Sequence, residues 1–256
     1  YNLLVMGAWM LSAAALGRGQ WWRCALWLTL AVAAKPVAVV LLLLVAVGWW
    51  RPMAWRLLVC FAGLLLLPFA LQWPGYVVEQ YQLFAAKLTT AGSPPKPEYY
   101  DINGLLNNEL ALGVPGSVVT LIRAAAALVV LGLVWLAGRG LGRRWAALWA
   151  LMWAVLYVML FNPRTEGPTF LLLMPMMGLA IGWVALGQWP GGAWALIALI
   201  LGTLAINFSF DLFNLLNTLA GEATYIHPKQ YWFRPLLVLM FSCYAAVVMF
   251  AMMRKA

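Results

Sequence analysis

The 256-residue chain is 66% hydrophobic and only 9% charged, with 16 basic residues, 7 acidic residues and a net charge of +9. A soluble domain is about 45–50% apolar and about 25% charged, so a soluble enzyme or a nucleic-acid-binding domain is excluded. Long apolar runs favour helices over a closed barrel in a membrane. The sequence therefore predicts an all-α polytopic transmembrane bundle, with residues 1–256 forming a single transmembrane domain.

Nine apolar segments follow one another along the chain and predict about eight or nine membrane segments. They are 2–16, 21–34, 36–50, 57–72, 117–137, 145–161, 168–187, 192–210 and 235–253. The second and third are too short to cross a core of about 30 Å comfortably. We expect a short hairpin that turns at Lys35-Pro36, because one continuous span would place Arg23 and Arg51 on opposite sides.

Basic residues are concentrated in alternate connectors. Nine of the sixteen lie in four of them: Arg18, Arg23, Arg51, Arg56, Arg139, Arg143, Arg144, Arg254 and Lys255. The positive-inside rule places these connectors in the cytoplasm, and all seven acids then fall on the outer side. Chemistry that needs carboxylates is predicted at the outer face.

The longest stretch between spans, 73–116, is predicted to form an outer amphipathic helix and loop. Val77, Tyr81, Phe84 and Leu88 recur at helical spacing, which indicates a helix over 76–90 lying in the outer interface.

Lys35 is the first candidate for function, because an ionisable group within a membrane segment is expensive. Its ammonium would suit a lipid phosphate; the alternative is a lysine that snorkels to the headgroups. The outer turn 162–168 adds Arg164 and Glu166, which are either site residues or a solvated pair of little energetic value.

Three further outer residues have similarly open interpretations. Asp101 either hydrogen-bonds sugar hydroxyls or is a solvating charge. His227 and Lys229, near Arg234, either bind phosphate or form an ordinary loop with headgroup anchors. No metal-ligand spacing, phosphate-binding glycine loop or nucleophile elbow is present in the sequence.

Short motifs resemble glycosyltransferase family 87, a group of GT-C-fold, polyprenol-phosphate-dependent mannosyltransferase-like membrane enzymes. The motifs are Asn2-Leu3-Leu4, Arg18-Gly19-Gln20, Ala33-Ala34-Lys35-Pro36 and the segment 161–169. The resemblance implies transfer of a mannose-like hexose from a polyprenyl phosphate to a lipid-linked or glycan acceptor. It places the protein in a bacterial inner membrane, among membrane lipids, with the active side periplasmic or extracellular.

Sugar transfer of this kind needs cations for the departing phosphate and a carboxylate for the acceptor proton, which suggests roles for the candidate residues. Lys35, Arg164, His227 and Lys229 would bind the donor phosphate, and Glu166 and Asp101 would bind acceptor or sugar; no metal or other cofactor is expected. Enzymes of this fold carry their catalytic acid in a first outer loop, which we expect upstream of Tyr1 in a longer protein. The fragment is then inactive alone, and Glu166 and Asp101 are the alternative bases.

Two other functions fit a chain of this kind. A transporter or flippase of a lipid-linked sugar would need polar residues at mid-depth in several spans. A non-catalytic membrane assembly subunit needs no active site.

Overall fold

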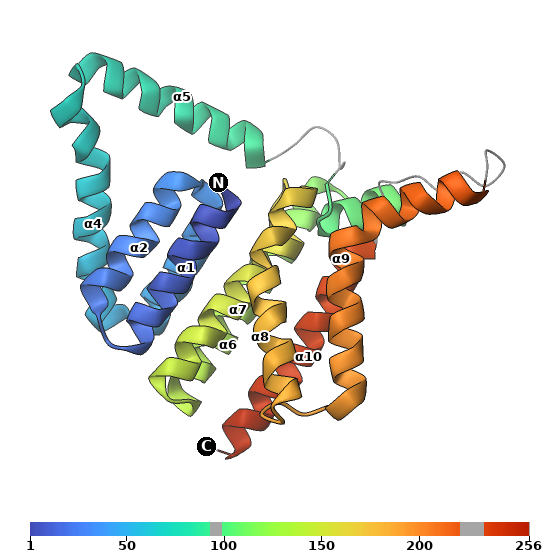
Figure 1. The fold of residues 1–256 in the computed structure, drawn as a ribbon. Coiled ribbons are helices and arrows are strands. Elements are labelled where there is room, and N and C mark those ends of the chain that lie inside the picture. The colour runs from blue at the N-terminus through green and yellow to red at the C-terminus, as the bar shows by residue number, and fades with distance from the viewer. Residues whose placement is uncertain (93–98, 221–232, 256) are drawn as a thin grey trace.

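In the residues that the computed structural model of the protein describes, which are 1–92, 99–220 and 233–255, helices are the only regular secondary structure (Figure 1). In chain order the helices are α1 Asn2–Gly17, α2 Trp21–Ala34, η1 Pro36–Ala38, α3 Val39–Gly48, α4 Trp50–Leu71, α5 Pro74–Gly92, η2 Gly104–Glu109, α6 Gly116–Gly140, α7 Arg143–Phe161, η3 Gly167–Leu172, α8 Met174–Ala185, α9 Gly192–Ala220 and α10 Phe233–Lys255. The predicted all-α class is confirmed.

The predicted apolar segments fall on these helices. Within the described residues, five helical stretches are long and apolar enough to cross a membrane: Trp50–Leu71, Gly116–Gly140, Arg143–Phe161, Gly167–Ala185 and Phe233–Lys255. Four shorter apolar stretches have 10–17 residues: Asn2–Gly17, Trp21–Ala34, Pro36–Gly48 and Gly192–Phe208. The protein thus has the helices of a multi-pass membrane bundle, and the number of crossings stays a prediction.

A tight turn separates α2 from η1 and α3. Lys35 has an extended backbone (φ −156°, ψ 121°) and Pro36 opens the next helical turn, where its missing N–H costs nothing. The chain then runs back toward the start of α2. The evidence is that the ring of Trp22, near the start of α2, lies 4.8 Å from the ring of Trp55, near the start of α4. The chain therefore turns at Lys35, at the end of the bundle away from Trp22.

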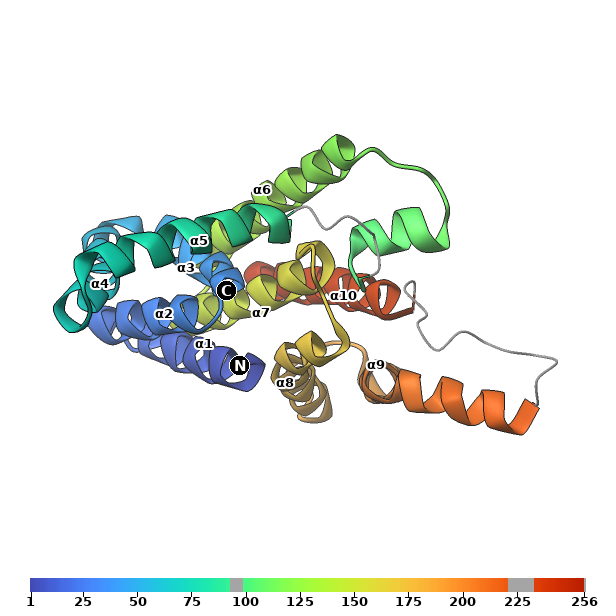
Figure 2. The same cartoon turned by 90° about the horizontal axis from the view of Figure 1, so that it is seen from above.

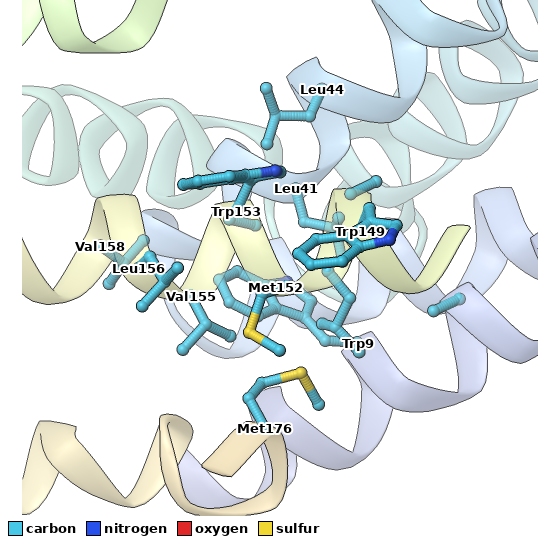
Figure 3. Packing of buried hydrophobic residues seen from close by; sticks show 14 of the residues in the cluster. Trp9, Leu41, Leu44, Trp149, Met152, Trp153, Val155, Leu156, Val158 and Met176 are labelled. Carbon is cyan, nitrogen blue, oxygen red and sulfur yellow. The ribbon is translucent and has the colours of Figure 1, made fainter. Parts of the chain in front are cut away.

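Helix α7 is the central helix. Both views place it between the α1–α2 pair and the group formed by α8, α9 and α10 (Figures 1 and 2). After Arg143 and Arg144 it is apolar all round, as expected for a helix surrounded by others. Trp149, Met152 and Trp153 are among its thirteen buried residues. In Figure 3 Met152 faces Met176 of α8, whereas Trp153 lies toward Leu44 of α3.

The two ends of the bundle differ in charge. We call the end that carries the α1–α2 turn, the α6–α7 turn and the C-terminus the basic end (Figure 1). There the Arg143 Nε donates to the Gly17 carbonyl at 3.3 Å, and Met253 packs against Gly140. Arg51 and Arg139 line one cavity at this end. The connectors rich in arginine are thus brought together.

The other end, which we call the mixed end, carries the first residues of α1, the turn at Lys35 and the turn 162–168. Helix α5 runs across it (Figure 1). Of the predicted apolar stripe on α5, Val77 is buried, whereas Phe84 and Leu88 are 49% and 43% exposed. Whether α5 lies in a membrane interface stays a prediction.

Candidate functional site

Lys35 is held by a residue from the start of α1. Its Nζ donates to Asn2 Oδ1 at 2.9 Å, and Asn2 Nδ2 donates to the Pro168 carbonyl at 2.9 Å. Three parts of the chain that are far apart in sequence therefore meet at this half-buried ammonium. An ammonium has three N–H donors, so one hydrogen bond to Asn2 leaves donors for an anion.

Glu166 is the acidic residue of this group. It is exposed, and its carboxylate interacts electrostatically with Lys35. Glu166 precedes η3, and its N–H donates to Thr169 Oγ1 at 3.4 Å. The buried hydroxyl of Thr165 contacts the carbonyls of Val158 and Asn162 at 3.2 and 3.1 Å. Local hydrogen bonds therefore fix the turn that presents Glu166.

Arg164 lies on the same turn but faces α5. Its Nη2 donates to the Thr90 carbonyl at 3.4 Å, and the side chain is exposed. The structure thus places Arg164 at the mixed end, where it contacts α5 instead of Lys35 or Asn2.

Asp101 is buried, with 1% of its side chain exposed, and its carboxylate has partners from within the protein. Its Oδ2 lies 2.7 Å from Arg123 Nη2, and its Oδ1 accepts the Gly104 N–H at 2.9 Å. Burial raises the pKa of the Asp101 carboxyl, although the hydrogen bonds from Gly104 and Arg123 act in the opposite direction. Both oxygens are engaged, so Asp101 joins the loop to α6.

Arg234 is a buried cation next to the 162–168 turn. Its guanidinium carbon lies 4.8 Å from the centre of the Tyr100 ring and 5.2 Å from that of Phe170, and the Tyr100 N–H donates to the Thr165 carbonyl at 2.9 Å. Only 7% of Arg234 is exposed. An arginine before Pro235 at the start of a span has the same sequence pattern as a headgroup anchor, so sequence reasoning missed its burial.

His227 and Lys229 lie outside the described residues, so their place relative to Lys35 stays a prediction. Within the described ranges, no three His, Cys, Asp or Glu side chains gather in a way that would hold a metal ion. The chemistry that the mixed end offers is that of a half-buried ammonium beside an exposed carboxylate. The ammonium can bind an anion, and the carboxylate can accept a proton.

Comparison with known proteins gives no relative: no family model matches the chain, and neither a curated protein nor a solved structure does. The glycosyltransferase resemblance therefore rests on the short motifs and the hydropathy pattern of the sequence. Three of the four motifs, which contain Asn2, Lys35 and Pro168, are joined by the hydrogen bonds of the mixed end.

Proposed function

We propose that this chain belongs to a membrane glycosyltransferase that moves a mannose-like hexose from a polyprenyl phosphate to a lipid-linked or glycan acceptor. The observation that carries the proposal is the contact of Lys35 with Asn2 beside Glu166 and Pro168. A cation within reach of the membrane and a carboxylate next to it are the two groups that sugar transfer from a phosphate requires.

The chemistry uses these groups in defined roles. The acceptor oxygen attacks the anomeric carbon, and its proton passes to a carboxylate. The bond from that carbon to the phosphate oxygen breaks, and the electron pair leaves with the phosphate, whose growing charge Lys35 stabilises. Glu166 is the described carboxylate whose charge acts on Lys35, so we assign it to the acceptor side.

The proposed orientation places the basic end in the cytoplasm and the mixed end outside, in a bacterial inner membrane. The support is the grouping of the arginine-rich connectors at one end, since such connectors are retained in the cytoplasm. A polyprenyl-phosphate sugar in the outer leaflet would then reach Lys35 from the membrane.

The interior of the spans favours an enzyme over a transporter. Where hydroxyls lie within the described spans, Ser12, Thr29 and Ser242 each donate to a carbonyl three or four residues earlier in their own helix. These groups are satisfied locally and do not mark out a polar path across the bundle. The charged and amide groups of the site all lie at the mixed end.

The proposal predicts that Lys35→Met weakens binding of a polyprenyl-phosphate hexose. The purified chain in nanodiscs is titrated with a short-chain polyprenyl-phosphate mannose, and bound ligand is counted by native mass spectrometry. Removing a charged donor from the phosphate should cost about 2 kcal/mol or more, roughly a 30-fold loss in affinity. Lys87→Met is the matched control, because Lys87 is an exposed lysine of α5 at the same end.

Equal affinity of the wild-type chain and Lys35→Met, or an equal loss in Lys87→Met, would contradict the assigned site. Movement of the intact sugar lipid across proteoliposomes, without release of polyprenyl phosphate, would favour the transporter function instead.

A further inference from the structure

A groove between α1, α7 and α8 lies toward the basic end and is separate from the mixed-end site. Its volume is about 520 Å³, and most of its lining is apolar. The lining residues are Met10, Ala13, Ala14, Gly17, Arg18, Arg144, Leu148, Leu151, Met176 and Leu179. Met10 and Ala14 are exposed, so the groove opens at the surface of the bundle.

Two arginines stand at the basic end of this groove without a partner among the described residues. Arg18 and Arg144 are exposed, and neither makes a hydrogen bond or an ion pair with another described side chain. Arg143 differs, because its Nε donates to the Gly17 carbonyl and its guanidinium lies 5.6 Å from the Trp21 ring. The connectors at the basic end contain no acidic residue. The groove therefore carries positive charge that no neighbouring acidic side chain neutralises.

The length of the groove matches one leaflet of a membrane. From Met10 to Arg18 the α1 helix rises about 12 Å at about 1.5 Å per residue, and half of a hydrocarbon core of about 30 Å is about 15 Å. An acyl chain lying against Met10 and Leu151 would thus bring its headgroup to the level of the two arginines. Lys and Arg pockets between membrane helices attract anionic headgroups in this way.

We propose that this groove binds an anionic phospholipid from the leaflet at the basic end. One acyl chain lies along the apolar wall formed by α1, α7 and α8. The phosphate lies between Arg18 and Arg144, whose guanidinium groups donate to its oxygens. The site is independent of the proposed sugar transfer, because it lies at the opposite end of the bundle from Lys35.

The test is retention of defined lipids by the purified chain. The protein is placed in nanodiscs of equal phosphatidylglycerol and phosphatidylcholine, extracted into mild detergent, and its bound lipids are counted by native mass spectrometry. The wild-type chain should retain phosphatidylglycerol selectively. Arg18→Gln and Arg144→Gln should each reduce that selectivity about fivefold.

Two further variants distinguish a specific lipid-binding groove from general electrostatic attraction of anionic lipid to the basic end. Ala14→Phe fills the groove without changing charge and should also remove the bound phosphatidylglycerol. Arg254→Gln removes an arginine of the same end that does not line the groove and should leave retention unchanged. Equal retention of both lipids by the wild type would overturn the proposal. So would a loss in Arg254→Gln as large as in Arg18→Gln, or full retention by a folded Ala14→Phe.

Discussion

Among single residues, Asp101 has the clearest effect on the dependence of stability on pH. Its carboxyl is 1% exposed, and burial raises its pKa above the ordinary value of 3.8. The folded protein therefore holds this proton more tightly than the unfolded chain does. The contribution of Asp101 to the free energy of unfolding is then largest below pH 3.8 and is lost as the pH rises through the raised pKa.

We predict that the wild-type chain loses more thermal stability than Asp101→Asn as the pH rises from about 3.5 to 6.5, because an amide cannot ionise. Thermal unfolding in detergent, followed by tryptophan fluorescence, measures both proteins. Glu79→Gln, which alters an exposed acid of α5, should follow the wild type. A wild-type midpoint that rises relative to Asp101→Asn over this range would show that the ion pair with Arg123 outweighs burial.

The role of a single residue could be predicted from sequence where its own segment decides that role. It could not be predicted where a contact between distant segments decides it. Lys35 stands out in sequence because a lysine within apolar segments is costly wherever it points. The pairing of Asp101 with Arg123 joins residues 22 positions apart, and the burial of Arg234 depends on Tyr100 and Phe170. Neither contact has a spacing that sequence could reveal.

At the scale of helices, sequence predicted where a helix lies better than where it begins or ends. Each of the nine apolar segments found by hydropathy lies mainly on described helix, because a continuous apolar run favours a helix that buries or shields its backbone polar groups. Hydropathy placed the fourth segment at 57–72, whereas α4 begins at Trp50. Arg51 and Arg56 interrupt the hydropathy without interrupting the backbone hydrogen bonds, and Pro52 is tolerated in the first turn. The turn of π-helix at Gly104–Glu109 has no apolar pattern and was not predicted.

The packing of α1 against α7 depends on a glycine. A Cβ at Gly17 would lie 3.3 Å from the Arg144 Cα, whereas a Cβ at Gly7 of the same helix would meet nothing within 4 Å. Small residues at membrane helix contacts let backbones approach closely.

Gly17→Leu should therefore destabilise the protein by about 1–3 kcal/mol, the usual cost of overpacking. Gly7→Leu should change stability by at most about 0.5 kcal/mol, as is typical of an open surface position. The measurement is the thermal midpoint of both variants in one detergent. Variants of equal stability would mean that α1 and α7 do not pack closely at Gly17.

At the scale of the whole molecule, the two proposed sites lie at opposite ends of the bundle, and these ends differ in charge. The arginine-rich turns meet at one end, joined by the contact of Arg143 with Gly17, and the ammonium of Lys35 meets Asn2 at the other. The sugar-phosphate site requires the mixed end to face outward, and the groove at Arg18 and Arg144 then lies in the cytoplasmic leaflet. The central claim is that these two ends lie on opposite sides of one membrane.

Site-directed labelling tests that claim most directly. Cys24, Cys60 and Cys243 are replaced by alanine, and single cysteines are introduced as Lys87→Cys on α5 and Gly142→Cys in the α6–α7 turn. In intact spheroplasts, a membrane-impermeant thiol reagent should label the Lys87→Cys protein at once and the Gly142→Cys protein only after the membrane is permeabilised. Labelling of both proteins from outside, or of the Gly142→Cys protein alone, would contradict the account.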